Sequence, residues 1–502
     1  MEKKVANRVV TAAQMPMTVY DMVSVMQNKY ADRVAFRYVE GKDTVVEKTY
    51  AQYVQDIRTM TGYLQQELQE CREKKVVILS RTNYEYGVVT FGTMMSGAVI
   101  VTLNQGKTWP ELEYELDLVE PDLIFNDGID YGYRAQLEAA YGEKLRPMDA
   151  WKGAAPAALE NRIDHEGLLM LMFTSGTTGR SKGVMLSEKN YFTAVQMYIN
   201  GQSIIPEIEE KLAPEYLDQT IAHFTLVPMF HLAGFICYFV YGIQGWVLNL
   251  CCDARDLRRD MSLMHSDAMS TPPVLVEMIY NEIRRGHKER LNGLWNLSCS
   301  SAILDPEILN YLVDNGIYIN QCYSMTELAG YGLLNVTQEG DHLRALGKPD
   351  GFCEVKVDET GEICVRGGCV MLGYYKDPEA TAEAIDKDGW LHTGDLARVD
   401  EEGYYYMTGR KKNLIILDSG ENVSPEELER LLGKCDAIKE CIVKEMGKKI
   451  GTVVCCEEEN QQQVKDFVTE LNRTLPMYKR ISVVECSAEP LPRNALGKLL
   501  RK

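Results

Sequence analysis

One stretch decides the fold of this chain: Leu171-Met172-Phe173-Thr174-Ser175-Gly176-Thr177-Thr178-Gly179-Arg180-Ser181-Lys182-Gly183-Val184. It begins in an apolar run, residues 168–173, that is typical of a buried strand, and continues into a loop of hydroxyls and glycines. Glycines let backbone N–H groups approach an anion, hydroxyls add donors, and Lys182 adds a positive charge. Such loops are often ordinary turns, but ten of these residues directly after an apolar strand favour a phosphate site. The order is not that of the P-loop of kinases and GTPases, because the Gly-Lys-Ser/Thr spacing is missing.

Length and composition indicate a globular protein with two or three hydrophobic cores. The chain has 502 residues, of which 45% are hydrophobic and 25% charged. The net charge of −19 argues against a nucleic acid or an anionic membrane as the main partner. The fourteen cysteines lack metal-binding spacing and C-x-x-C pairs, and no signal peptide is evident, so we expect reduced thiols and a cytoplasmic location.

Residues 219–252 contain no Asp, Glu, Lys or Arg, and this length could cross a bilayer. The stretch nevertheless includes two histidines, a proline and three glycines. We interpret residues 221–227 as a strand, residues 235–241 as a helix and residues 246–250 as a second strand of a doubly covered core. No membrane span is expected.

Strand and helix patterns alternate before the loop. The predicted elements are strands at residues 76–79, 98–103 and 121–125 and helices at residues 86–96 and 109–119. This alternation predicts a parallel sheet with helices on both faces. Residues 128–166 are poorly periodic, and we interpret them as a connection.

Downstream of the loop, the α/β pattern resumes with a helix that Ser187 is suited to cap. Further predicted elements are helices at residues 274–285 and 307–313, each opened by proline, and strands at residues 294–298 and 317–321. From about residue 347 shorter strands separated by turns predict a β-rich subdomain.

A domain boundary is expected near Gly409-Arg410-Lys411-Lys412-Asn413. Beyond it, residues 414–417 have the pattern of a strand and residues 418–422 that of a turn. Ser424, a following proline and Glu427 form the pattern of a capping box at the start of a helix. The rest of the chain fits a small α+β module.

Five separated segments match one family in order. They are residues 174–183, Gln321-Cys322-Tyr323-Ser324-Met325-Thr326-Glu327, Thr393-Gly394-Asp395, Gly409-Arg410-Lys411-Lys412 and Pro492-Arg493-Asn494-Ala495-Leu496-Gly497-Lys498. The chain resembles the adenylate-forming superfamily, which includes acyl- and aryl-CoA synthetases, peptide-synthetase adenylation domains and firefly luciferase. Each segment alone is weak, but five in order are strong evidence.

The resemblance implies an α/β fold with two domains. The larger, residues 1–409, would bind ATP and the acid, and would consist of parallel-type sheets covered by helices plus the β-rich subdomain. A hinge at residues 410–412 would join it to a small mobile α+β C-terminal domain, residues 413–502.

The resemblance also implies a two-step reaction with ATP, Mg²⁺ and CoA. A carboxylate attacks the α-phosphorus of ATP to give acyl-AMP and pyrophosphate, and a thiol then takes the acyl group. Because negative charge accumulates on the phosphates, backbone donors, a cation and a metal are what this chemistry requires.

Three residues would be catalytic by this resemblance. Lys498 would bridge the carboxylate and the α-phosphate, although a lysine near a chain end is often only a solvated tail. Glu327 would hold Mg²⁺, a hard cation that favours carboxylate oxygens. Thr326 would contact the α-phosphate.

Nucleotide-binding residues follow from the same matches. Tyr323 would stack on adenine, and Asp395 would accept the ribose hydroxyls with help from Arg410. The other expected nucleotide-binding residues are Thr174, Ser175, Gly176, Thr177, Thr178, Gly179, Lys182 and Ser301. The loop would hold the β- and γ-phosphates, which leave as pyrophosphate.

The acid would lie near residues that are small or medium in size. The expected pocket residues are His231, Ser300, Ala302, Ser324 and Gly330. His231 could instead be a core histidine. No aspartate lies between Asp218 and Asp253 to pair with an ammonium, so an amino acid is disfavoured and a neutral carboxylic acid is preferred. The size of these residues weakly favours a short-chain or aryl acid.

Lys412 stands where the family swivels its small domain between the two half-reactions, although a basic run can also be a solvated linker. Two features depart from the family pattern. Ser324 stands where glycine is usual, which leaves specificity open. The small domain is also trimmed around residues 445–449, which leaves acceptor docking open.

The leading hypothesis is an ATP-dependent acid–CoA ligase. The same first step would serve an acid:carrier-protein ligase that loads a phosphopantetheinyl arm in trans, since no carrier domain follows Lys502. A hypothesis of another class is a non-catalytic nucleotide-binding paralogue. The intact Lys498, Glu327 and Asp395 argue against it.

Overall fold

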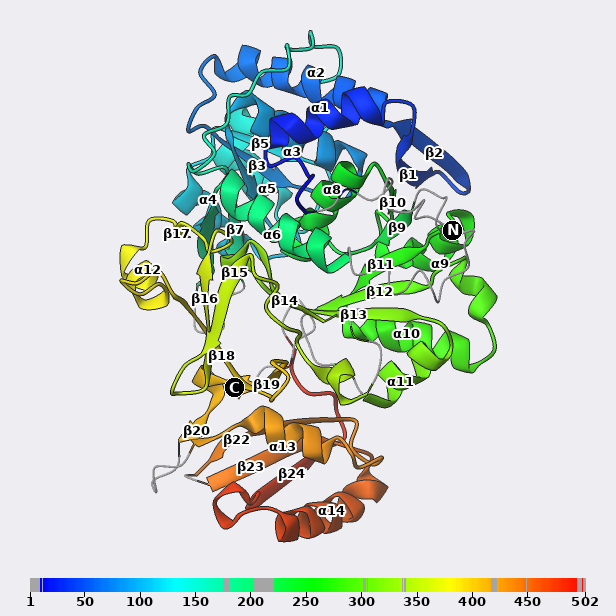
Figure 1. The fold of residues 1–502 in the computed structure, drawn as a ribbon, viewed down its shortest axis with the longest axis vertical. Coiled ribbons are helices and arrows are strands. Elements are labelled where there is room, and N and C mark those ends of the chain that lie inside the picture. Colours follow the sequence, from blue (N-terminus) through cyan, green and yellow to red (C-terminus); the bar gives the residue numbers. More distant parts are fainter. Residues whose placement is uncertain are drawn as a thin grey trace. The chain divides into compact units, whose positions relative to one another are not determined.

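The computed structural model describes residues 10, 12–174, 180–202, 221–300, 304, 306–335, 337, 340–416, 422–447, 449–493 and 499. The chain divides into two compact units, one formed by Met1–Val355 and Val365–Leu391 and the other by Lys356–Cys364 and His392–Lys502. Helices and strands alternate along much of the first unit (Figure 1). This unit contains an eight-stranded and a seven-stranded sheet, which confirms the predicted α/β class.

The seven-stranded sheet carries the predicted phosphate loop. Its order is β17-β8-β7-β4-β3-β5-β6. The strands are β3 Lys75–Leu79, β4 Val99–Thr102, β5 Leu123–Asn126, β6 Leu145–Pro147, β7 Met170–Thr174, β8 Lys182–Leu186 and β17 Gly373–Tyr374. Neighbours from β7 to β6 are parallel, whereas β8 and β17 run antiparallel to their neighbours. The loop therefore connects the two strands of a hairpin.

Both faces of this sheet are buried. Val77 of β3 packs in one apolar cluster with Leu112 and Leu116 of α4. Val76 and Ile78 point to the opposite face and are also fully buried. The helices of this region are α2 Tyr50–Leu68, α3 Tyr84–Ser96, α4 Trp109–Val119 and α5 Arg134–Tyr141. Burial on two faces explains the continuous apolar runs from which the strands were predicted.

The expectation that residues 128–166 form only a connection is wrong. They contain α5, a 3-10 turn at Gly142–Lys144 and the edge strand β6. Leu137 is buried, but the other residues of α5 are exposed or half-buried. A helix with so little apolar surface gives no periodic signal in the sequence.

The eight-stranded sheet has the order β14-β13-β12-β11-β9-β10-β1-β2. Its strands are β1 Val34–Glu40, β2 Thr44–Thr49, β9 Ala222–Thr225, β10 Val247–Leu250, β11 Ala268–Thr271, β12 Asn296–Ser300, β13 Tyr318–Met325 and β14 Gly330–Asn335. The strands from β13 to β1 are parallel, and the edge strands β14 and β2 are antiparallel.

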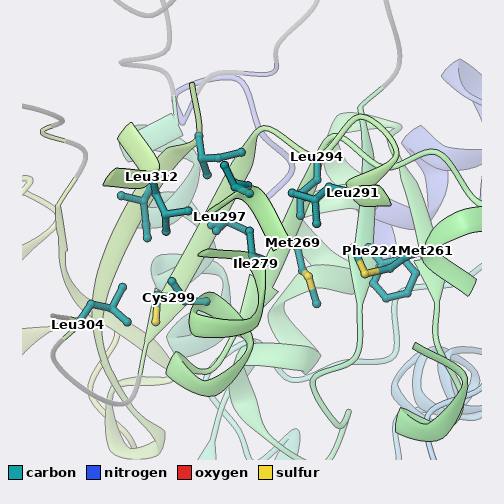
Figure 2. Packing of buried hydrophobic residues seen from close by; sticks show 14 of the residues in the cluster. Phe224, Met261, Met269, Ile279, Leu291, Leu294, Leu297, Cys299, Leu304 and Leu312 are labelled. Atoms are coloured by element: carbon teal, nitrogen blue, oxygen red, sulfur yellow. The ribbon is translucent and has the colours of Figure 1, made fainter. Parts of the chain in front are cut away.

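One face of this sheet rests on an apolar core. Phe224, Met269 and Leu297, from three neighbouring strands, pack with Ile279 of α10 and Leu312 of α11 (Figure 2). The helices around this core are α9 Leu257–Leu263, α10 Pro273–Arg284 and α11 Pro306–Asp314. Side chains alternate between the two faces along a strand, so Ser270, which follows Met269 on β11, lies on the opposite face.

That opposite face is covered by α6 Glu188–Gln202 and α8 Leu232–Gln244. Ser187 caps α6, as predicted, because its Oγ accepts a hydrogen bond from the backbone N–H of Asn190 at 3.1 Å. The uncharged stretch forms β9, α8 and β10, so its interpretation as strand, helix and strand is confirmed. Among the described residues, no helix has both the length and the apolar character needed to traverse a bilayer.

The second unit is rich in short strands. A four-stranded sheet has the order β15-β16-β18-β19, and β15, β16 and β18 each also have residues in the first unit. The elements are β15 Cys353–Val357, β16 Glu362–Gly367, β18 Leu391–Val399, β19 Tyr405–Arg410, β20 Ile415–Ile416, β21 Asn422–Val423, β22 Glu440–Met446, β23 Lys449–Cys455, β24 Val483–Ser487, α13 Pro425–Leu432 and α14 Gln461–Thr474. Strands β22, β23 and β24 form a separate three-stranded sheet.

The boundary predicted at residues 410–412 lies inside this second unit, and a hinge there stays a prediction. Ser424 caps α13 by accepting from the backbone N–H of Glu427 at 3.4 Å. In the predicted capping box the Glu427 carboxylate would accept from the backbone N–H of Ser424. It pairs instead with the Lys479 ammonium at 2.7 Å. All fourteen cysteines lie in the described part of the chain and are free thiols.

Candidate active site

The hairpin of β7 and β8 positions the predicted phosphate loop. Thr174 closes β7 and lies opposite Lys182, the first residue of β8. This pairing places a hydroxyl and an ammonium at the two ends of the loop. The loop residues between them, Ser175, Gly176, Thr177, Thr178 and Gly179, lie outside the described residues.

A buried carboxylate holds the segment just before β8. Ser181 Oγ donates a hydrogen bond to Glu115 Oε1, and the Lys107 ammonium pairs with the same oxygen. Glu115 lies on α4, is fully buried, and its Oε2 has no hydrogen-bond partner among the described residues. Burial raises the pKa of Glu115, and the pairing with Lys107 opposes that rise. These three residues, the loop anchor, fix the strand that presents Lys182.

Tyr374 connects Lys182 with Glu327. The centroid of its ring lies 4.7 Å from Lys182 Nζ, and its hydroxyl donates to Glu327 Oε1 at 2.9 Å. The backbone N–H of Met371 also donates to the carbonyl of Glu327 at 2.9 Å. Burial first, and then the Glu327 charge, raise the pKa of Tyr374, so the phenol stays protonated and can donate at neutral pH. The structure thus brings the loop lysine and the predicted metal ligand onto one tyrosine.

The segment predicted to be catalytic lies where β13 ends. Tyr323 and Ser324 belong to β13, and the pairing with β14 shifts register between them. Thr326 and Glu327 lie in the short 3-10 turn that follows, and Ala329 then adopts a left-handed φ of 52°. The turn reverses the chain between two antiparallel strands, so the side chains of this segment are held at a sheet end.

Two predicted pocket residues lie beside the helices of the same sheet face. His231 caps α8, because its Nδ1 accepts from the backbone N–H of Ala233 at 3.2 Å. Gly330 opens β14 with a φ of 143°, and a Cβ there would lie 3.2 Å from Ile236 Cδ1 and 3.5 Å from Ala194 Cβ. Gly330 therefore faces α8 and α6.

Some predicted site residues cannot be placed. Ser300 is the last residue of β12, and its side chain lies outside the described part of the chain. Ser301, Ala302 and Lys498 lie entirely outside it. Their assigned roles stay predictions.

The predicted ribose-binding pair is formed within the second unit. Asp395 of β18 and Arg410 of β19 are direct partners in the antiparallel register. Arg410 Nε lies 3.0 Å from Asp395 Oδ1, and the Asp395 side chain is only 10% exposed. A carboxylate fixed in this way can accept hydrogen bonds from a diol.

Glu362, a buried residue of β16, holds the part of β18 just before Asp395. Its Oε1 accepts from the backbone N–H of Gly394 at 2.7 Å, and its Oε2 lies 2.8 Å from Lys411 Nζ. The hydrogen bond to Glu362 is the main reason that the pKa of Lys411 is raised. One carboxylate thus ties the segment of β18 before Asp395 to Lys411, the residue that follows Arg410.

Asp358, Cys364 and His392 form the group within the described residues that has metal-ligand spacing. Lys411 already supplies a positive charge to this group, because its ammonium interacts with Asp358, Cys364 and Glu362. We therefore assign no metal to it. The side chain of Lys412, the predicted hinge residue, is exposed.

Three residues of the site were not predicted from the sequence: Glu115, Tyr374 and Glu362. Their respective partners, Ser181, Glu327 and Gly394, lie 66, 47 and 32 residues away along the chain. Spacing within a single segment carries no signal for such contacts. Each of the three acts by holding a segment that was predicted.

The sequence of this chain is similar to those of many known proteins. Residues 24–375 match the family model described as AMP-binding enzyme. The chain is similar to a probable CoA ligase, CCL5, of Humulus lupulus, with 28% identity over 474 residues that cover 85% of this chain and 82% of the relative. It is also similar to the 2-succinylbenzoate–CoA ligase of Bacillus mycoides (strain KBAB4), with 28% identity over 456 residues, 86% of this chain and 88% of the relative.

Solved structures have the same fold. ATP-bound MatB from Rhodopseudomonas palustris matches with a TM-score of 0.81 and 23% identity, covering 97% of this chain and 98% of that one. O-succinylbenzoate coenzyme A synthetase (MenE) from Bacillus subtilis, in complex with ATP and magnesium ion, matches with a TM-score of 0.78 and 22% identity, covering 96% and 98%.

Proposed function

Because the chain belongs to the family of AMP-binding enzymes and is an AMP-forming acid–thiol ligase, we propose that it activates a carboxylic acid with ATP and transfers the acyl group to CoA. Family membership confirms the resemblance to the adenylate-forming superfamily that the five sequence segments carry. The reactants and the residue roles given below are the proposal.

The observation that carries the proposal is the arrangement of Lys182, Tyr374 and Glu327. A single tyrosine holds an ammonium at 4.7 Å from its ring and a carboxylate at 2.9 Å from its hydroxyl, directly beside the phosphate-loop hairpin. Attack on the α-phosphorus builds negative charge on the α-phosphate and the departing pyrophosphate. A fixed cation and a fixed metal ligand at this place would stabilise that charge.

Glu327 fits Mg²⁺, because its carboxylate offers the hard oxygen ligand that this ion prefers and it is linked through Tyr374 to Lys182, the first residue of β8. When bound, Mg²⁺ would neutralise phosphate charge. Tyr374 would orient the Glu327 carboxylate by donating to its Oε1. Lys182 and Thr174 would bind the β- and γ-phosphates.

The other residues would position the reactants. Tyr323 would stack on adenine, Thr326 would contact the α-phosphate, and the Asp395–Arg410 pair would bind the ribose hydroxyls. Lys498 would bridge the acid carboxylate and the α-phosphate, which aligns the nucleophile and offsets charge as the new bond forms. We propose that rotation about Lys412 then brings residues of the small domain to the thioester-forming step.

Two relatives support the choice of acceptor and acid. Both are named CoA ligases, which favours CoA over a carrier protein, and one acts on 2-succinylbenzoate, which favours an aryl acid. The absence of an aspartate between Asp218 and Asp253 favours an acid without an ammonium. A cytoplasmic location stays part of the proposal.

The test is a pyrophosphate-release screen across short-chain and aryl acids, with and without CoA, followed by mass spectrometry of the products. We expect acid-dependent pyrophosphate and an acyl-CoA thioester with at least one acid. Acyl transfer to a phosphopantetheinylated carrier but not to CoA would refute the choice of acceptor. Absence of acid-dependent pyrophosphate with every acid would refute acid activation.

A further inference from the structure

The sulfur atoms of Cys353 and Cys369 lie in contact within the first unit. Cys353 opens β15, and Cys369 lies in the turn that follows β16, the neighbouring strand of the sheet. Both residues are free thiols, and their Sγ atoms are 2.8 Å apart. A disulfide joins two sulfurs at about 2.05 Å, so these two need to approach by less than about 1 Å to bond. The thiols are therefore placed to form a disulfide within the existing sheet.

The backbone around Gly367 brings the two thiols together. Gly367 ends β16 with a φ of 146°, which favours glycine, and a Cβ there would lie 2.9 Å from Cys353 Sγ. The backbone N–H of Val370 donates to the carbonyl of Gly367 at 3.2 Å, which closes a turn with Gly368 and Cys369 at its centre. This turn folds Cys369 back onto the start of β15.

The two thiols differ in exposure and in acid strength. Cys353 is 6% exposed, whereas Cys369 is 0% exposed. Hydrogen bonds from the thiol and the backbone N–H of Cys369 lower the pKa of Cys353, against the opposing effects of burial and of the Asp350 charge. The same contact between the thiols, together with burial, raises the pKa of Cys369. Because the thiolate is the reactive form of a cysteine, Cys353 is the nucleophile and Cys369 keeps its proton.

The turn belongs to residues 367–374, here called the strap, which are tied to the start of α6. Asn190 Nδ2 donates to the carbonyls of Gly368 and Val370 at 2.8 and 2.7 Å. A Cβ at Gly368 would lie 2.6 Å from Thr193 Oγ1, so the strap packs closely on this helix. The strap is therefore held on one side by α6 and touches β15 on the other through Cys369.

The strap also supports Glu327. The backbone N–H of Met371 donates to the carbonyl of Glu327, and the Tyr374 hydroxyl donates to its carboxylate, both at 2.9 Å. Met371 follows Cys369 by two residues and Tyr374 follows it by five. A bond that moves Cys369 therefore acts on the short segment that positions Glu327.

We propose that Cys353 and Cys369 are a peroxide-sensitive thiol pair, which closes to a disulfide and thereby weakens the hold of the strap on Glu327. The Cys353 thiolate attacks one oxygen of hydrogen peroxide and displaces hydroxide, which gives a sulfenic acid and takes up the proton that Cys353 released. The Cys369 sulfur then attacks the sulfenic sulfur, and its thiol proton leaves with the hydroxyl as water. Two thiols are oxidised to one disulfide, and hydrogen peroxide is reduced to two waters. The effect on Glu327 rests on the proposed function, whereas the oxidation site does not.

The test treats the full-length wild-type enzyme with equimolar hydrogen peroxide, alkylates the remaining thiols in denaturant and maps the tryptic peptides by mass spectrometry. Trypsin cuts after Lys and Arg but not before proline, so Cys353, Cys364 and Cys369 fall in separate peptides, residues 345–356, 357–366 and 367–376. We expect the first and third peptides to be cross-linked and to be released by dithiothreitol. Full alkylation of Cys353 and Cys369 after peroxide, or a cross-link of either to Cys364, would overturn the inference.

Three serine variants assign the order of the two thiols. In Cys369→Ser the sulfenic acid at Cys353 has no thiol to resolve it, so dimedone should label residues 345–356. In Cys353→Ser, residues 367–376 should stay unlabelled. Cys71→Ser, at a thiol that is similarly buried with 4% exposure, should cross-link as the wild type does. Dimedone on Cys369 in Cys353→Ser, with none on Cys353 in Cys369→Ser, would overturn the assigned order.

Pyrophosphate release at varied Mg²⁺, before and after peroxide, tests the effect on Glu327. We expect oxidation to raise the Mg²⁺ concentration for half-maximal release about 2- to 10-fold, as the loss of one hydrogen bond would. The rise should be reversed by dithiothreitol and should be missing in Cys353→Ser. An unchanged Mg²⁺ dependence in the cross-linked enzyme would overturn the link to Glu327. No release with any acid before oxidation would overturn the proposed function and this link, while the mapped peptides would still decide the thiol pair.

Discussion

The loop anchor of Lys107, Glu115 and Ser181 leads to a specific prediction about Glu115→Ala. The Glu115 side chain is 0% exposed and that of Lys107 is 14% exposed, so the substitution leaves a largely buried ammonium without its partner. Breaking a buried pair of this kind costs about 3–5 kcal/mol of stability. Ser181 also loses its acceptor, and the segment that presents Lys182 is no longer held.

The double variant Lys107→Met/Glu115→Leu separates stability from function. Replacing both members of a buried pair by apolar residues is often neutral or stabilising by about 1–4 kcal/mol, so urea denaturation should show most of the stability restored. The KM for ATP should stay raised about 2- to 10-fold, because the hydrogen bond of Ser181 is still missing. Ser181→Ala should raise the KM similarly with little effect on stability.

These variants are compared by urea denaturation and by pyrophosphate release at varied ATP. A Glu115→Ala protein as stable as the wild type would show that the pair is not buried as described. A double variant that recovers both stability and the wild-type KM for ATP would refute the role of the loop anchor in ATP binding.

The same carboxyl predicts a pH dependence. Burial raises the pKa of Glu115 above its ordinary 4.5, so the folded state binds this proton more tightly than the unfolded state does. Its contribution to stability is therefore fully present below pH 4.5 and is lost as the pH rises through the folded pKa. Relative to Glu115→Gln, the wild type should lose stability over that window in urea titrations. Parallel pH profiles would contradict this account.

Three further substitutions test the proposed site. Tyr374→Phe keeps the ring beside the loop lysine but removes the donor to Glu327, so the Mg²⁺ concentration for half-maximal pyrophosphate release should rise about 2- to 10-fold; an unchanged Mg²⁺ dependence would count against the link. Glu362→Ala removes the acceptor of the Gly394 N–H and should raise the KM for ATP, with partial recovery in Glu362→Gln, and no difference between the two would indicate a purely structural effect. Lys498→Ala should abolish acyl-AMP formation while sparing thioester formation from synthetic acyl-AMP, and equal loss of both steps would exclude the assigned role.

Much of the scaffold could be predicted because its signals are local. The apolar run before Thr174 predicts β7, and the alternation of residues 75–125 predicts five elements that the structure contains. The glycines and the proline of the uncharged residues 219–252 indicate a strand, a helix and a second strand in place of a membrane span. Elements whose burial is slight, such as α5, have no comparable signal.

The polar contacts of the site could not be predicted because they depend on tertiary structure. Helix α4 carries glutamates at positions 111, 113 and 115, a residue type that is rarely buried. Glu111 does cap the helix through Thr108, and Glu113 is exposed, but Glu115 turns inward under the hairpin and is fully buried. Nothing in the sequence of the helix distinguishes the third glutamate from the first two.

Several site residues that the family resemblance assigned lie in contact within the structure. Asp395 and Arg410 are register partners whose Oδ1 and Nε atoms lie 3.0 Å apart, and their role at the ribose stays a prediction. Glu327 and Lys182 meet on Tyr374. The first contact follows from the pairing of β18 with β19, and the second depends on Tyr374, which no matched segment contains.

The most direct test of the central claim is ATP–pyrophosphate exchange measured without CoA across a panel of carboxylic acids. If the enzyme forms acyl-AMP, exchange will depend on the acid, and adding CoA will release AMP together with an acyl-CoA thioester. Release of ADP in place of AMP, or exchange that is the same with and without acid, would contradict the account.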